Sequence, residues 1–164
     1  MEEKVDFIYL SEVPDVRIRI IKDTDTEPTI QSKIKYPFEL FNTITITVKT
    51  NIRLFEFDVY NGYTWNGADI PRFLWRIVGS RTDNQFLVAS MIHDYLLQFK
   101  KYMIKEVLED KITIDEYRYL TSIIFREKLY KSGVSTVKAN IMSWCVDVFQ
   151  HYFNRKEWKN AKIK

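Results

Sequence analysis

Apolar and polar residues alternate in short runs through the first half of the chain, in the manner of β-strands. The runs occupy residues 16–21, 43–49 and 52–60. The clearest run reads TITITVK, in which Ile44, Ile46 and Val48 face one side of an extended strand. This alternation is typical of antiparallel sheets with one covered face. We therefore predict such a sheet, and an exposed polar loop at residues 22–29.

The apolar period becomes helical in the second half of the chain. Between residues 85 and 99, apolar side chains recur at spacings of three and four. Thr113 and Glu116 match a capping box, which predicts a second helix that ends at Gly133. A third apolar pattern predicts a helix over residues 135–153. Together these elements predict an α+β fold, with an antiparallel sheet from the N-terminal half packed against about three C-terminal helices.

Length and composition predict one soluble domain. The chain has 164 residues, of which 46% are hydrophobic, enough for one core. We divide it into an N-terminal arm with the first strands (residues 1–50), a core (51–153) and a basic tail (154–164). The formal charge of +3 is too weak to favour nucleic-acid binding, and no apolar stretch is long enough for a membrane span. The single cysteine, Cys145, lies in an apolar helical pattern, which favours a buried thiol.

The segment GYTWNGADIPR, at residues 62–72, reads as a structural turn between sheet and helices. Its glycines permit backbone angles that other residues avoid, and its proline fixes the exit of the chain. Asn66 or Asp69 could accept hydrogen bonds from amides exposed by the reversal. Trp65 is expected to fill the junction with the helices. The predicted structural residues are Gly62, Trp65, Asn66, Gly67, Pro71 and Arg72.

An adjacent histidine and aspartate on the first predicted helix form the candidate chemical site. His93, Asp94 and Asp69 could supply an imidazole and two carboxylates to a divalent metal, with a bound water as nucleophile. In the alternative interpretation, His93 donates a hydrogen bond to the turn backbone while Asp94 caps the turn or pairs with Arg72. One histidine with two carboxylates is a thin ligand set, so we favour the structural role and predict neither metal nor cofactor.

The order of these motifs resembles the DUF1353 family, which occurs mostly in tailed bacteriophages and prophages. The resemblance covers roughly residues 52–153 and rests on NGADIPR, MIHDYLL and IDEYRYL. In that family, an acidic residue in the turn, the His-Asp pair and a later aspartate resemble a hydrolase-like or metal-binding site. This chain has Asn66, Asp69 and Arg118 where the pattern leads us to expect the turn acid, a small residue and the later aspartate. An amide is a poorer ligand than a carboxylate for a hard cation, so the site reads as degenerate.

The resemblance implies a bacteriophage virion structural protein, a ring or connector component of the tail or head-to-tail region. Expected partners are other virion proteins and copies of the chain in a homo-oligomeric ring. The expected location is the virion, and the host cytoplasm before assembly. Apolar groups in residues 1–50, interrupted by prolines, favour an arm that docks onto a partner. The alternative is a small metal-dependent hydrolase acting on cell-wall peptide or another amide, in which His93 and Asp94 bind the metal and Asp69 is a ligand or base.

Overall fold

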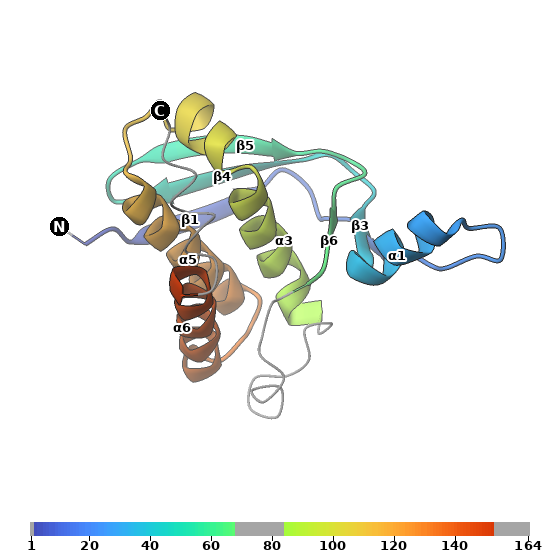
Figure 1. Cartoon of the computed structure of the whole chain (residues 1–164). Coiled ribbons are helices and arrows are strands. Elements are labelled where there is room, and N and C mark those ends of the chain that lie inside the picture. Colours follow the sequence, from blue (N-terminus) through green and yellow to red (C-terminus); the bar gives the residue numbers. More distant parts are fainter. Residues whose placement is uncertain (1, 68–83, 153–164) are drawn as a thin grey trace.

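The structure is a computed structural model, and it describes residues 2–67 and 84–152 (Figure 1). The first part contains β1 (Val5–Leu10), β2 (Val16–Ile18), α1 (Glu27–Lys35), β3 (Phe38–Leu40), β4 (Ile44–Thr50), β5 (Leu54–Val59) and β6 (Thr64–Trp65). The second part contains α3 (Asn84–Gln98), α4 (Lys100–Tyr102), the π-helical turn η2 (Met103–Val107), α5 (Ile114–Lys131) and α6 (Thr136–Tyr152). Strands dominate the first half and helices the second, which confirms the predicted α+β class.

Strands β1, β4 and β5 form an antiparallel sheet with β4 at its centre. The alternating residues Ile44, Ile46 and Val48 of β4 are all buried, as the sequence predicts. On the opposite face, Thr45 and Thr47 donate hydrogen bonds to carboxylates on β5. The sheet therefore has one apolar and one polar face, and the helices cover the apolar face (Figure 1).

Helices α3 and α5 pack together against the apolar face, and α6 packs on α5 (Figure 1). The capping box is confirmed: Thr113 Oγ1 accepts from the Glu116 amide at 3.3 Å, and Glu116 accepts from the Thr113 amide at 2.8 Å. Helix α5 ends shortly before Gly133, which has a φ of 86°. Cys145 on α6 is buried, as predicted. Within the described ranges, no helix combines the length and apolarity needed to cross a bilayer.

A second antiparallel sheet, in the order β2-β3-β6, lies beside α1 at the right-hand end of the molecule in Figure 1. Its central strand is anchored to the core, because Phe38 and Leu40 are buried. The Gly62 amide donates a hydrogen bond to the Leu40 carbonyl at 2.7 Å, which ties the turn after β5 to β3. We call residues 16–41, which contain β2, α1 and β3, the N-terminal lobe.

The structure corrects the predicted polar loop at residues 22–29. Helix α1 begins inside this segment and has Pro28 in its first turn, where the missing proline N–H leaves no helical hydrogen bond unmade. The strands predicted at 16–21 and 52–60 are shorter, at Val16–Ile18 and Leu54–Val59. The sequence predicts one sheet, and the structure has two. The second sheet is missed because β3 and β6 have only three and two residues, too few to show an alternating pattern.

The predicted division at residues 50 and 51 falls in the turn between β4 and β5 of the first sheet. Strands β1 and β4, from the first 50 residues, contribute side chains to the same core as the helices. The N-terminal lobe is the part of this region that extends away from the core (Figure 1). The predicted basic tail at 154–164 lies outside the described residues.

Candidate functional site

Strand β6 meets α3 through a buried tryptophan. The Trp65 side chain is completely buried, and its Nε1 donates a hydrogen bond to Ser90 Oγ at 3.2 Å. The Ser90 hydroxyl in turn donates to the Leu87 carbonyl at 2.9 Å, within the same helix. A buried indole N–H requires such an acceptor, since an unsatisfied buried donor costs about 1–3 kcal/mol. Trp65 therefore fixes the strand before the turn against the helix that carries the His-Asp pair.

His93 and Asp94 are both buried, and His93 Nδ1 lies 3.7 Å from Asp94 Oδ1. The His93 ring packs on the Phe125 ring of α5, with 5.1 Å between the centroids. Its second nitrogen, Nε2, is buried and has no hydrogen-bond partner in the described part of the chain. The His93 ring therefore lies at the interface of α3 and α5, with Nδ1 near a carboxylate.

Tyr63 brings a further polar group toward Asp94. Its hydroxyl is buried, and its ring stacks on Trp65 with 5.9 Å between the centroids. Burial, and secondly the negative charge of Asp94, raise the pKa of the Tyr63 phenol far above its usual range. The phenol is therefore protonated at neutral pH. Asn66 follows Trp65 in the chain, and its side-chain oxygen is also buried.

The predicted turn is partly described. Gly62 and Gly67 both have a φ of 86°, in the left-handed region that favours glycine. A Cβ at Gly62 would meet no atom within 4 Å, so a substitution there acts through the backbone angle. Asp69, Pro71 and Arg72 lie outside the described residues, and so does the predicted pairing of Asp94 with Arg72.

Arg118 is directed toward α6. Its Nη1 lies 2.6 Å from His151 Nδ1 and 3.8 Å from Asp147 Oδ1. The two histidines of the chain thus have different surroundings: His151 is exposed beside a guanidinium, and His93 is buried beside a carboxylate. His151 therefore forms its polar contact on the outer side of the helical layer.

The described residues offer limited metal chemistry. They contain no group of three or more histidine, cysteine, aspartate or glutamate side chains that could hold a metal ion. His93 and Asp94 supply two donors, and a third from this region would have to come from outside 2–67 and 84–152. Burial raises the pKa of the Cys145 thiol, which keeps it protonated and poorly nucleophilic at neutral pH. The described arrangement places an imidazole 3.7 Å from a carboxylate, too far apart for a direct hydrogen bond, with the protonated phenol of Tyr63 close enough to feel the charge of Asp94.

Sequence reasoning misses Tyr63 and Ser90. Tyr63 stands two positions before Trp65, so the two side chains share one face of an extended segment. Ser90 stands three positions before His93, on the same side of a helix. These spacings are the signals that could have identified both residues.

A family model described as "Protein of unknown function (DUF1353)" matches residues 39–146. The chain belongs to the DUF1353 family. The match begins in β3 and ends within α6, so it includes the turn and the His93–Asp94 pair but leaves out most of the N-terminal lobe.

One curated relative of this DUF1353 protein is "Uncharacterized protein y4jT" of Sinorhizobium fredii (strain NBRC 101917 / NGR234). The two sequences are 30% identical over an alignment of 103 positions, and the match covers 58% of this chain and 26% of the relative. The chain thus spans about a quarter of the length of the curated relative that it matches. No solved structure matches it significantly.

Proposed function

We propose that this DUF1353 protein is a structural component of a bacteriophage virion, in which copies of the chain form a ring in the tail or head-to-tail connector. The observation that carries the proposal is the apolar surface of the N-terminal lobe. Its exposed large apolar side chains are Ile18, Ile20, Ile21, Ile34 and Phe41. Ile18, Ile20 and Phe41 line one shallow groove of about 300 Å³, together with the charged residues Arg19, Lys22, Lys33 and Glu39. Exposed apolar groups gathered in this way are typical of surfaces that contact a partner.

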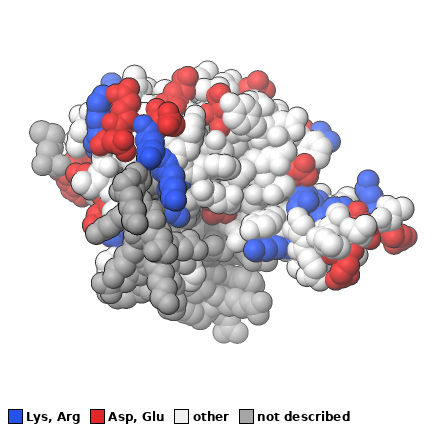
Figure 2. Space-filling model, turned by 45° about the horizontal axis from the view of Figure 1, so that its top comes forward, with Lys and Arg blue, Asp and Glu red and all other residues white. Residues whose placement is uncertain are grey.

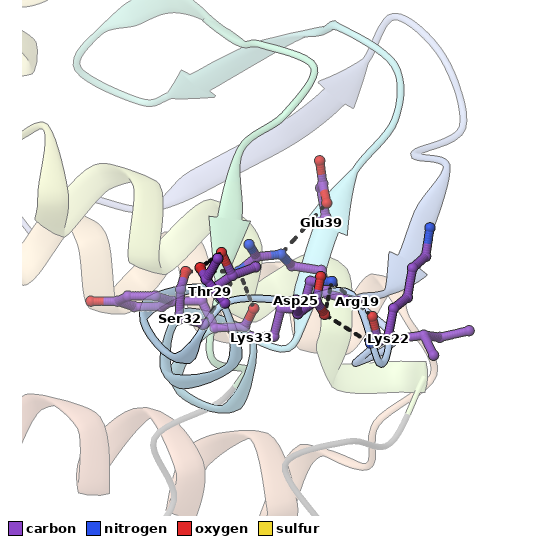
Figure 3. A network of polar contacts seen from close by, with 10 residues as sticks. Arg19, Lys22, Asp25, Thr29, Ser32, Lys33 and Glu39 are labelled. Atoms are coloured by element: carbon purple, nitrogen blue, oxygen red, sulfur yellow. Dashed lines mark hydrogen bonds and ion pairs between the residues drawn. The ribbon is translucent and has the colours of Figure 1, made fainter.

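Polar contacts hold the lobe together (Figure 3). Arg19 Nη1 donates to the Tyr36 carbonyl at 3.0 Å and to the Ser32 carbonyl at 3.3 Å. Lys33 Nζ donates to the Ile20 carbonyl at 2.9 Å and pairs with Asp25 at 2.6 Å. No residue of α1 is fully buried. Helix α1 is therefore fastened to the rest of the lobe through hydrogen bonds and ion pairs, which leaves exposed isoleucines such as Ile20 and Ile34 available for contact with another surface.

A second set of exposed apolar side chains lies at the other end of the molecule, around the turn between β4 and β5 (Figure 1). Phe7, Ile52 and Leu54 are exposed there. We call these three residues the turn patch. Lys49 of β4 pairs in register with Phe7 of β1 and with Leu54 of β5. The two apolar residues therefore lie on either side of Lys49. Contact between different patches on neighbouring copies is head-to-tail, and such contacts close into rings when the rotation permits. The proposed ring joins the lobe of one copy to the turn patch of the next.

Particle composition tests the virion proposal. Purified phage particles should contain this protein in a fixed number of copies, measured by quantitative mass spectrometry. Ile20→Lys places a charge on the lobe and should abolish incorporation. Val137→Lys is the matched control, because Val137 on α6 is 68% exposed and Ile20 is 72% exposed. Absence of the wild-type protein from particles, or normal incorporation of the Ile20→Lys variant, would contradict the proposal.

The second candidate is a small metal-dependent hydrolase acting on cell-wall peptide or another amide. It is favoured by the buried His93 Nε2, which has no partner among the described residues and could face a metal or a substrate. In this case His93 and Asp94 would bind the metal, and Asp69 would complete the site. Elemental analysis of the purified protein distinguishes the candidates. About one zinc ion per chain that is lost in His93→Ala would support the hydrolase, and a metal-free wild-type protein would remove it.

A further inference from the structure

A cleft lined by aromatic side chains lies between the end of β5 and the end of α3. Its volume is about 420 Å³, within the range of small-molecule sites. Five aromatic side chains line it: Tyr60, Tyr63, Tyr95, Phe99 and Tyr102. Asn61 and Gly62 complete the lining. We call this site the aromatic cleft. It is separate from the groove of the lobe, and no residue lines both sites.

The inner rings of the aromatic cleft are held by packing against each other. The Tyr95 ring lies 4.6 Å from Phe99 and meets Tyr63 edge to face at 5.3 Å, measured between centroids. On its other side, Tyr95 stacks on Phe57 at 5.5 Å with an interplanar angle of 15°. Offset and edge-to-face contacts are the stable arrangements of aromatic pairs. The inner wall of the cleft is therefore a fixed aromatic surface, whereas Tyr60 and Tyr102 are largely exposed at its rim.

The polar groups of the aromatic cleft are neutral hydrogen-bonding groups. Burial raises the pKa of the Tyr95 phenol to about 12, and Tyr102, Tyr60 and Asp58 contribute further to this rise. The phenol groups of Tyr60, Tyr95 and Tyr102 therefore lie near one another. The Asn61 side chain adds an amide, and among residues 2–67 and 84–152 no charged side chain lines the cleft. Figure 2 shows a face on which charged side chains gather at the left and on the lobe, with a largely uncharged middle.

We propose that the aromatic cleft binds a neutral carbohydrate, such as a short oligosaccharide of hexoses. A sugar ring offers an apolar C–H face, which stacks on aromatic rings, and hydroxyl groups, which exchange hydrogen bonds with phenols and amides. The cleft presents both kinds of group side by side. A nucleotide or single-stranded nucleic acid would also stack, but its phosphates need cationic groups, and none is present among the described lining residues. The proposal is independent of the virion role, since it requires neither a ring nor a particle.

Titration of the full-length protein with defined sugars tests the proposal. Cellotriose, maltotriose and N,N′,N″-triacetylchitotriose would be added separately, and amide chemical shifts followed by NMR. At least one sugar should shift the amides of Tyr60, Asn61 and Tyr102 in a saturable manner. A proline-rich peptide and an oligothymidylate are the comparison probes, because both ligands also use aromatic surfaces.

Two rim variants locate the binding. Tyr60→Ala and Tyr102→Ala should each weaken sugar binding about fivefold, because a stacked aromatic contact contributes on the order of 1 kcal/mol beyond the buried area. Tyr9→Ala on β1 is the matched control: Tyr9 is 60% exposed and Tyr60 is 63% exposed. Tyr102→Phe retains the ring and should weaken binding less than Tyr102→Ala. Saturation by none of the sugars, equal loss in the Tyr9→Ala variant, or binding of the peptide or the oligothymidylate in place of sugar would overturn the proposal.

Discussion

The N-terminal lobe and the sheet-helix core distribute their side chains in opposite ways. In the core, Ile46 and its neighbours on β4 are buried under the helices, while threonines and carboxylates face outward. In the lobe, Arg19 and Lys33 lie inward with most of their side-chain surface covered, while Ile18 and Ile20 are exposed. The core is therefore stabilised by apolar burial, whereas the lobe combines the buried Phe38 and Leu40 of β3 with a polar network around α1. This contrast fits the proposal that the lobe presents apolar groups to a partner.

The largest expected effect is the difference in stability loss between shortening an apolar side chain in the core and shortening one in the lobe. Ile46→Ala should lower the free energy of unfolding by about 2–5 kcal/mol, because it leaves a cavity in a closely packed core. Ile20→Ala should change it by less than about 0.5 kcal/mol, as expected for an exposed site. Urea denaturation of both variants measures the difference. Comparable losses would mean that Ile20 is part of a core and would break the comparison.

A smaller effect is expected at the helix starts. Thr113→Ala removes the capping box of α5 and should cost about 1 kcal/mol of unfolding free energy. Thr26 occupies the same position before α1, but its side chain makes no capping hydrogen bond to the helix. Thr26→Ala should therefore cost only a few tenths of a kcal/mol. Thermal and urea unfolding would show both values, and equal losses would contradict the assigned caps.

The sequence predicts those parts of the fold that carry a local signal. The period of two in β4 and the capping box of α5 are visible in the chain, and both are present in the structure. The first residues of α1 are misread because Pro28 and its polar neighbours resemble a loop. Strand β3 pairs with both β2 and β6, and strands β3 and β6 are too short to show a period. Their placement is set by tertiary contacts that a single sequence does not display.

The candidate site also contains some features that the sequence indicates and others that only the folded structure shows. His93 and Asp94 are adjacent in sequence, so their joint placement on α3 follows from the helical pattern. The approach of Tyr63 to Asp94 does not, because it depends on how β6 lies against α3. The aromatic cleft is also hidden from the sequence, since Tyr60 and Tyr63 come from one segment and Tyr95 and Tyr102 from another. Long-range packing brings these rings together.

The smallest expected effect is a pH dependence of the stability of the lobe, which tests whether its polar network holds α1. Hydrogen bonds from the Lys22 amide and the Lys33 side chain lower the pKa of Asp25. A carboxylate whose pKa is lower in the folded state stabilises that state above its unfolded pKa of about 3.9. This stabilisation is lost as pH falls through the folded pKa.

Amide chemical shifts of α1 should therefore change as Asp25 is protonated. Asp25→Asn should remove this step in the titration of α1, because the amide does not titrate. NMR spectra of the two proteins across the acid range provide the measurement. An identical α1 titration in the Asp25→Asn variant would show that another group controls the lobe.

The central claim is that the lobe of one copy binds the turn patch of the next, and sedimentation velocity of the purified full-length protein tests it most directly. Wild-type protein and Val137→Lys should sediment as a closed oligomer, whereas Ile20→Lys and Leu54→Lys should each sediment as monomers. An equimolar mixture of these two variants retains one intact lobe and one intact turn patch, so it should form a dimer and nothing larger. A wild-type monomer at all concentrations, or a mixture that stays monomeric, would contradict the account.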